Sequence, residues 1–370
     1  MAERQGSPAD SYYLRGDHMS GWEKNIRKVD PYVPGEQPQA SDVIKLNTNE
    51  NPYPPSPAVI RALEEMKTED SYRKYPDPTA KDLKKALAKY YSVDKERIFI
   101  GCGSDDVLSI GFLTFFNSDK PVLFPDVTYS FYPVWAKVYG IPYEEIPLVD
   151  GFGINVDDYA RDNCGGVVIA NPNAPTGVTM DINKLEKIIA ANRDVIVIVD
   201  EAYTDYCSST ALPLLDKYDN LVIVRTFSKS RAMAGARIGF AIAGKRLIRA
   251  MDDVAQSINS YPISATSLVA AVASVGDDKY FKDRIADVIN TRARTVLELK
   301  RRGFTVLPSG TNFVFVSHAH LQAEDIFDSL REKNIYVRHF KHPKIDNYLR
   351  ITIGTDNQMD DLFAAIDEII

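Results

Sequence analysis

Short apolar runs rich in β-branched residues alternate with helical periods from about residue 56 onward. Each run is apolar on both of its faces, which is typical of strands buried in a parallel sheet. Helices are expected from Ser56 to Met66, where Pro57 occupies the first helical position, and again after Pro78. The pattern predicts an α/β fold with a mostly parallel sheet flanked by helices. Strands are predicted at Ile98–Ile100, Val122–Phe124, Val167–Ile169, Val195–Val199, Leu221–Val224 and Ile238–Ile242.

The pattern changes after about residue 265 and predicts a smaller α+β domain. Its helices are expected at Tyr280–Arg302, Ala323–Glu332 and around Met359–Ile366, and its strands at Phe313–Val316, Ile335–Val337 and Leu349–Ile353. The proline-rich segment that ends near Leu46 has no clean periodicity, so we expect an arm that lies over another surface.

These patterns divide the chain into four segments. Residues 1–18 are expected to be a leader or disordered, because a plausible second start stands at Met19. Residues 19–46 form the N-terminal arm, which we expect to pack on the small domain or on a partner subunit. Residues 47–265 form the large domain, and residues 266–370 form the small C-terminal domain.

Composition excludes several classes of protein. The 370 residues include 44 Lys and Arg and 51 Asp and Glu, and a net charge of -7 disfavours binding to nucleic acid or anionic membranes. Three cysteines, an odd number without C-x-x-C spacing, argue against a disulfide framework and favour the reducing cytoplasm. The pairs His318/His320 and His339/His342 lack a third ligand at sensible spacing, so no metal site is expected.

Polar residues that carry chemistry stand at the ends of the predicted strands, where open α/β sheets bind their ligands. A strand passes through Gly101 and Gly103 into a helix start, which suits a phosphate, although an ordinary capped turn is the alternative. Asp200 leaves a second buried strand, and Lys229 follows a third, eight residues before Arg237. Taken together, the three segments indicate a ligand with a phosphate, a protonatable ring nitrogen and an aldehyde.

The same residues belong to motifs that resemble those of the fold-type I pyridoxal-phosphate aminotransferases, and more narrowly the histidinol-phosphate aminotransferases. The motifs follow one another in family order from about residue 22 to the C-terminus. They are Lys45–Tyr53, Arg73–Asp77, Gly103–Asp106, Asn171–Gly177, Asp200–Tyr203, Thr226–Lys229 and Leu349–Thr355.

The resemblance implies a role in binding pyridoxal 5'-phosphate for residues of the large domain. Lys229 would bond to the cofactor aldehyde and later move the proton at the substrate Cα. Asp200 would pair with the ring nitrogen, Tyr203 would hydrogen-bond the 3' oxygen, and Tyr129 would stack on the ring. The phosphate would be held by Gly103, Ser104, Asp105, Thr226, Ser228 and Arg237.

One position departs from the family pattern. The asparagine that contacts the 3' oxygen normally stands just before the proline of the Asn-Pro-Thr-Gly motif, and Ala174 occupies that position here. Asn171 or Asn173 would then supply the missing hydrogen bond, and Asn171 is the preferred candidate.

The resemblance also implies how substrates bind. Arg350 corresponds to the arginine that binds the substrate carboxylate, and in this subfamily the same site also accepts a phosphate. Arg338, Tyr32 and Asn49 would assist it, and Tyr75 would reach into the active site of the second subunit of a homodimer.

The expected function is therefore an enzyme of histidine biosynthesis. It would transfer the amino group of L-histidinol phosphate to 2-oxoglutarate, giving imidazole-acetol phosphate and L-glutamate. A threonine-phosphate decarboxylase and an aromatic amino-acid aminotransferase are alternatives within the family, and a non-catalytic pyridoxal-phosphate-binding module is an alternative of another class.

Overall fold

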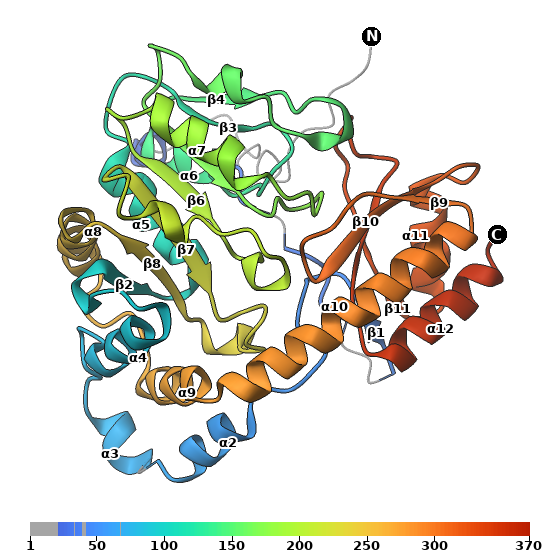
Figure 1. Ribbon diagram of the computed structural model, residues 1–370, viewed down its shortest axis with the longest axis horizontal. Coiled ribbons are helices and arrows are strands. Elements are labelled where there is room, and N and C mark those ends of the chain that lie inside the picture. The colour runs from blue at the N-terminus through green and yellow to red at the C-terminus, as the bar shows by residue number, and fades with distance from the viewer. Residues whose placement is uncertain (1–20, 33, 39–41, 67) are drawn as a thin grey trace.

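A large α/β domain and a smaller α+β domain lie side by side, with the long helix α10 (Asp278–Arg301) running between them (Figure 1). This computed structural model describes residues 21–32, 34–38, 42–66 and 68–370. The expected leader, residues 1–18, lies outside the described residues. The predicted fold class is confirmed.

The large domain is built on a seven-stranded sheet. Its strand order is β2 (Ile98–Gly101), β8 (Gly239–Ala243), β7 (Leu221–Thr226), β6 (Val197–Asp200), β5 (Gly166–Ala170), β3 (Val122–Pro125) and β4 (Tyr143–Ile146). Strand β8 is antiparallel to both of its neighbours, and the remaining pairs are parallel. Each of the six predicted runs forms a strand. Strand β4 was not predicted.

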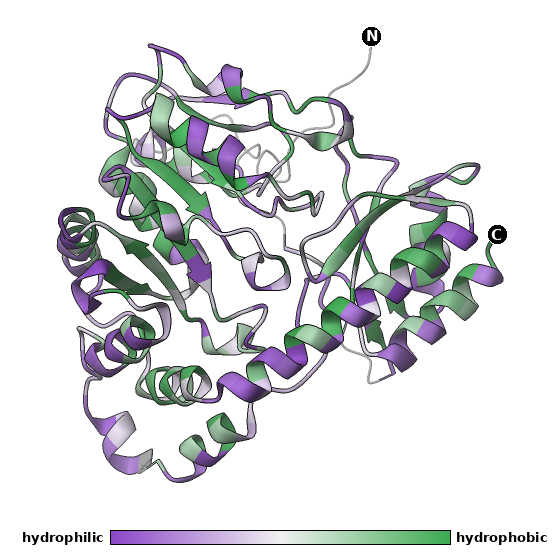
Figure 2. Cartoon of the chain, in the orientation of Figure 1, coloured by the Kyte–Doolittle hydropathy of each residue, from purple (hydrophilic) through white to green (hydrophobic). Residues whose placement is uncertain are grey.

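Helices cover both faces of this sheet, because successive strand residues point to opposite sides. Val168 packs in a core shared with α5 (Gly103–Phe115), α6 (Tyr132–Tyr139) and α8 (Lys245–Ile258). Its neighbours Val167 and Ile169 pack in the opposite core. That core includes α2 (Pro57–Glu64), α4 (Lys81–Tyr91), α7 (Ile182–Ala191) and α9 (Ala265–Gly276). Figure 2 shows the resulting apolar strands between helices with polar outer faces.

Helix α9 lies just beyond the boundary expected near residue 265. Its Ala270, Ala271 and Val275 are buried in the core of the large sheet. The packing of the large domain therefore continues to the end of α9.

The small domain contains an antiparallel sheet in the order β12 (Arg338–His339), β13 (Leu349–Thr352), β10 (Phe313–His318) and β9 (Phe304–Val306). Helices α10, α11 (Ala323–Glu332) and α12 (Asp356–Asp367) pack against it. The predicted strand at Ile335–Val337 is present but ends one residue earlier than expected. The chain forms β11 (Ile335–Tyr336), breaks at the buried Val337, and continues as β12 with a different partner.

The described part of the arm contacts both domains of its own chain. Strand β1 (Ile44–Lys45) pairs with β11, and Glu36 forms an ion pair with Arg331 of α11 at 2.9 Å. Tyr32 stacks on Phe131 of the large domain, with ring centroids 4.3 Å apart. Packing on a partner subunit stays a prediction. In the part of the chain that the structure describes, no helix is long and apolar enough to cross a membrane.

Candidate active site

A pocket opens where the strands of the large sheet end and the small domain begins. The carboxyl ends of β3, β5, β6 and β7 meet at this edge, and the antiparallel β8 brings its amino end to the same edge. The expected site residues that line the pocket are Ser104, Asp105, Tyr129, Asp200, Tyr203, Ser228, Lys229 and Arg237. Thr48 and Glu50 of the segment after β1 complete its wall.

One end of the pocket is suited to an anion. Helix α5 begins at Gly103 with a φ of +85°, and the side chain of Cys102 does not cap it. The start of α5 packs closely against the start of β8 and the residue Arg237 before it. A Cβ added to Gly239 would lie 2.3 Å from the carbonyl carbon of Gly103, and a Cβ added to Gly103 would lie 2.6 Å from Nη2 of Arg237. The positive end of the helix and a guanidinium therefore stand side by side, an arrangement that binds phosphate.

Asp105 organises this end of the pocket with its side chain. One carboxylate oxygen accepts a hydrogen bond from Arg237 at 3.2 Å, and the other accepts one from the hydroxyl of Tyr129 at 2.7 Å. Burial raises the pKa of Tyr129 above its usual range, and the charge of Asp105 raises it further, so the phenol stays protonated. Asp105 thus fixes two other expected site residues.

The hydroxyls after β7 form a short chain. Thr226 donates to the hydroxyl of Ser228 at 3.0 Å and accepts the backbone N–H of Ser228 at 3.1 Å. Ser228 lines the pocket, whereas Thr226 lies behind it and orients it.

Asp200 ends β6 and is almost completely buried, yet it faces the pocket. Its carboxylate accepts hydrogen bonds from the hydroxyl of Tyr132 at 2.9 Å and from the N–H of Ala202 at 3.1 Å. Burial raises the pKa of Asp200 to about 6, and these two donors limit the rise. A buried carboxylate of this kind is suited to pair with a cationic ligand atom.

Lys229 directs its amine across the pocket. Its Nζ donates to the carbonyl oxygen of Thr48 at 3.3 Å and lies 5.8 Å from the ring centroid of Tyr203. Asn51 donates to the carbonyl oxygens of Lys229 and Ser230, both at 3.2 Å. The loop that carries the amine is therefore fixed by the segment that follows β1.

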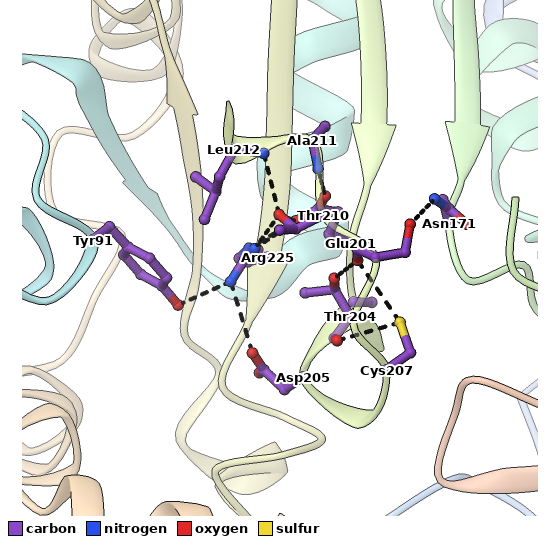
Figure 3. A network of polar contacts seen from close by, with 12 residues as sticks. Tyr91, Asn171, Glu201, Thr204, Asp205, Cys207, Thr210, Ala211, Leu212 and Arg225 are labelled. Atoms are coloured by element: carbon purple, nitrogen blue, oxygen red, sulfur yellow. Dashed lines mark hydrogen bonds and ion pairs between the residues drawn. The ribbon is translucent and has the colours of Figure 1, made fainter. Parts of the chain in front are cut away.

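A buried polar network joins β6 and β7 behind the pocket (Figure 3). Arg225 donates through Nε and Nη2 to one oxygen of Glu201, at 2.9 and 2.6 Å, and both side chains are buried. Burial alone would lower the pKa of Arg225, but the charge of Glu201 reverses this and raises it. Asp205 lies 3.7 Å from Arg225 and accepts a hydrogen bond from Ser230, the residue after Lys229. The network thus connects the strand ends that carry Asp200 and Lys229.

Tyr203 is oriented by Asn49, which was expected to bind substrate. The amide Nδ2 of Asn49 donates to the hydroxyl oxygen of Tyr203 at 2.9 Å. Its Oδ1 accepts from the hydroxyl of Thr352, which in turn accepts the N–H of Asn49. This ring of hydrogen bonds fixes the amide orientation, so Tyr203 must donate its own proton elsewhere, and the pocket lies beside it.

Two arginines of the small domain lie close to residues that line the pocket, because Arg350 interacts electrostatically with Tyr203, Tyr129 and Arg338. Arg338 and Arg350 occupy opposed positions on β12 and β13, and both guanidinium groups lie over the ring of Phe340, at 5.5 and 5.4 Å. Burial lowers the pKa of Arg350, and its Nε is buried without a hydrogen-bond partner. No carboxylate among the described residues lies within ion-pair distance of Arg350. Two adjacent cations of this kind are suited to a substrate anion.

The structure places Asn171 and Asn173 outside the pocket, contrary to the prediction that one of them replaces Ala174. Asn171 exchanges hydrogen bonds with the backbone of Met180, and its amide also donates to Ser209. Asn173 binds the carbonyl of Val127 and the hydroxyls of Thr128 and Thr176. Ala174 itself lines the pocket. Backbone partners occupy both amides, which sequence spacing could not show.

Two expected residues lie farther out. Tyr32 reaches the pocket border through its stacking on Phe131 next to Tyr129. Tyr75 follows α3 (Thr68–Arg73), is 81% exposed and stacks on Tyr261 with ring centroids 4.5 Å apart. It lines a groove separate from the pocket of its own chain.

Several residues of the site have no role predicted from the sequence. Thr48, Glu50 and Asn51 are among them, although a run of polar residues just after a strand is a usable signal. Tyr132 was missed because a fully buried tyrosine looks like core, and its spacing of three residues from Tyr129 was the available clue. Among the described residues, no cluster of three or more His, Cys, Asp or Glu side chains could hold a metal ion.

Comparisons with known proteins identify the class. The family described as "Aminotransferase class I and II" matches residues 41–366, and this chain belongs to that family.

Two curated relatives and one solved structure share one description. "Histidinol-phosphate aminotransferase" from Lactococcus lactis subsp. cremoris is 48% identical over 349 residues, which are 94% of this chain and 98% of that relative. The protein of the same description from Acinetobacter baumannii is 48% identical over 342 residues, 92% and 94% of the two chains. The structure of histidinol-phosphate aminotransferase from Sinorhizobium meliloti in complex with pyridoxal-5'-phosphate superposes with a TM-score of 0.84 at 26% identity, covering 96% and 98% of the two chains.

Proposed function

We propose that this protein is a pyridoxal-phosphate-dependent aminotransferase that acts on L-histidinol phosphate in histidine biosynthesis. It transfers the amino group to 2-oxoglutarate, giving imidazole-acetol phosphate and L-glutamate. The observation that carries the proposal is one pocket that places the amine of Lys229 and the buried carboxylate of Asp200 around a common space, with Arg350 close enough to interact electrostatically with Tyr203 and Tyr129 of its lining.

The side chains present fit the cofactor. The start of α5, Ser228 and Arg237 would hold the phosphate. Asp200 would pair with the ring nitrogen, and Tyr129 would pack on the ring. Tyr203, whose proton is directed away from Asn49, would donate to the 3' oxygen. Pyridoxal phosphate supplies an aldehyde that exchanges amino groups and a ring that accepts electrons from the substrate Cα.

Lys229 and Asp200 have separate roles in the reaction. Lys229 would hold the cofactor through its amine and would take the proton from the substrate Cα once that amine is free. Asp200 would keep the ring nitrogen protonated, because solvent compensates its own charge poorly. Thr48 and Glu50, in the segment after β1, form part of the pocket wall that excludes water, which strengthens these electrostatic interactions.

Arg338 and Arg350 account for a phosphorylated substrate. A carboxylate can be bound by one guanidinium, whereas a phosphate carries more charge and more acceptor oxygens. The pair of arginines over Phe340, with Tyr32 beside them, would bind the phosphate of histidinol phosphate in one half-reaction and a carboxylate of glutamate in the other.

Substitution of Arg338 tests the choice of substrate. We expect Arg338→Ala to lower kcat/KM for histidinol phosphate by roughly 10- to 100-fold more than for glutamate, because a charge-assisted hydrogen bond is worth about 1.5–3 kcal/mol. Arg301→Ala, a change at an exposed residue far along α10, serves as the matched control. Equal losses for both substrates would remove the support for a phosphorylated substrate.

A panel of amino donors with 2-oxoglutarate separates the family alternatives. Faster turnover of phenylalanine or tyrosine would indicate an aromatic aminotransferase, and release of carbon dioxide from threonine phosphate would indicate a decarboxylase.

Borohydride reduction followed by peptide mapping should place a pyridoxyl label on Lys229, and Lys229→Ala should abolish turnover. A protein that binds the cofactor but turns over none of the amino donors would be a non-catalytic binding module.

The enzyme is also proposed to act as a cytoplasmic homodimer in which Tyr75 enters the partner's site. In support, Tyr72 and Tyr75 line one groove and Tyr261 stacks on Tyr75, and the three are exposed by 78%, 81% and 43%, which is unusual for large apolar side chains gathered together. The three cysteines are all unpaired, as is usual in a reducing compartment.

A further inference from the structure

The ring of Tyr132 is completely buried at the start of α6, on the side of Asp200 away from the open pocket. Aromatic rings enclose it, with centroids of Phe112 and Phe124 at 6.1 and 5.8 Å. Its hydroxyl donates to Oδ2 of Asp200 at 2.9 Å. A tyrosine used only for packing would not need this hydroxyl, because a buried O–H must be compensated.

The groups around Asp200 make this hydrogen bond important. Among the described residues, Tyr132 is the one side chain that donates to the carboxylate, and the N–H of Ala202 is the one backbone donor. Among the charged groups around Asp200, the carboxylates of Asp105 and Glu201 oppose its ionisation, while the cations of Lys229 and Arg237 line the same pocket. The two donors therefore help to offset both burial and like charge.

We propose that Tyr132 is a positioning residue that orients the Asp200 carboxylate toward the cofactor ring nitrogen and keeps it ionised. The inference rests on the proposed function, since it needs the cofactor. Tyr132 does not line the pocket, so it acts through Asp200 alone. Burial, followed by the charge of Asp200, raises the pKa of Tyr132 well above its usual range, so its hydroxyl remains a donor at every working pH.

The test is Tyr132→Phe in the holoenzyme, which removes one oxygen from the packed ring. We expect the dissociation constant of pyridoxal phosphate, followed by absorbance, to rise roughly 10-fold or more, since the lost bond is made to a charged group. Tyr139→Phe is the matched control, because Tyr139 lies on the same helix and bonds Ser109 at 2.5 Å, away from Asp200. Circular dichroism of both variants checks that they fold.

The pH dependence separates positioning from packing. Cofactor affinity in the unmodified enzyme should fall as the pH drops through about 6, where Asp200 takes up a proton. In Tyr132→Phe this fall should begin at higher pH, because the bond that lowers the pKa of Asp200 is gone. An affinity loss that is equal at every pH, or no loss at all, would overturn the proposal.

The outcome is independent of the substrate assignment. These measurements use pyridoxal phosphate alone, with no amino donor. A protein that binds the cofactor as described but does not turn over histidinol phosphate would contradict the proposed function and leave the role of Tyr132 standing. A protein with no affinity for pyridoxal phosphate would contradict both.

Discussion

The buried carboxylate of Asp200, which suits cofactor binding, lowers the free energy of unfolding at neutral pH. Burial raises its pKa from 3.8 to about 6, so the ionised form is less favourable in the folded protein than in the unfolded chain. For an acid whose pKa is raised, the folded state binds more protons between these two values, so this group lowers the free energy of unfolding as the pH rises through that window. The penalty is fully present above about pH 6.

The variant Asp200→Asn should therefore stabilise the cofactor-free protein while it weakens cofactor binding. Because a shift of about two units corresponds to about 3 kcal/mol, we expect a gain of up to that size at pH 7.5 and almost none near pH 4. Urea unfolding of the cofactor-free protein at the two pH values measures it. A lower free energy of unfolding than that of the unmodified protein at pH 7.5 would contradict this account.

Individual residues also show where sequence reasoning reached its limit. Lys229, Asp200 and Arg237 were placed in one site because the carboxyl ends of parallel strands share an edge. The roles of Asn171 and Asn49 could not be deduced, since each amide is committed by partners that lie far along the chain or in the backbone of a loop. Hydrogen bonds of this kind depend on geometry that side-chain type does not encode.

At the scale of elements, the buried pair Glu201–Arg225 holds the ends of β6 and β7 in register (Figure 3). A single substitution would leave a charge buried without its partner, which is far more costly than the pair itself.

We expect Arg225→Leu to lower the free energy of unfolding by about 3–5 kcal/mol. Adding Glu201→Leu should recover much of this loss, because the fully buried carboxylate is then gone, and Asp205 is partly exposed and keeps its hydrogen bond from Ser230. Chemical denaturation of the single and double variants gives the coupling. Simple addition of the two losses would show that the pair acts as two independent side chains.

Strands that are buried on both faces have continuous apolar sequences, and these strands were predicted. Strand β4 was not predicted, because it lies at the edge of the sheet and its Glu144 and Glu145 are exposed, so its sequence is not continuously apolar. The break at Val337 escaped for another reason: Val337 is buried like its neighbours, and only the change of pairing partner separates β11 from β12. Apolar patterns report burial and do not report which strand pairs with which.

At the scale of the whole molecule, the proposed dimer makes each active site a shared structure. Tyr75 lies outside the pocket of its own chain, so a Tyr75 defect on one chain and a Lys229 defect on the other would fall in the same site of a mixed dimer and leave its second site intact.

Mixing unfolded Lys229→Ala and Tyr75→Ala chains and refolding them together should restore activity above that of either parent. Random pairing gives mixed dimers as half of the population, each with one intact site, so about a quarter of the normal activity is expected. Activity no greater than the average of the separate parents would show that Tyr75 serves its own chain or no site at all.

The segment that follows β1 belongs to both domains. Asn49 bonds Thr352, 303 residues further along the chain, while Asn51 fixes the loop of Lys229. Asn49, near the start of the chain, can therefore form its hydrogen bond with Thr352 only after almost all of the chain has been synthesised. A nascent or truncated chain that lacks Thr352 would also lack the hydrogen bonds that hold Asn49 in place to orient Tyr203 in the pocket.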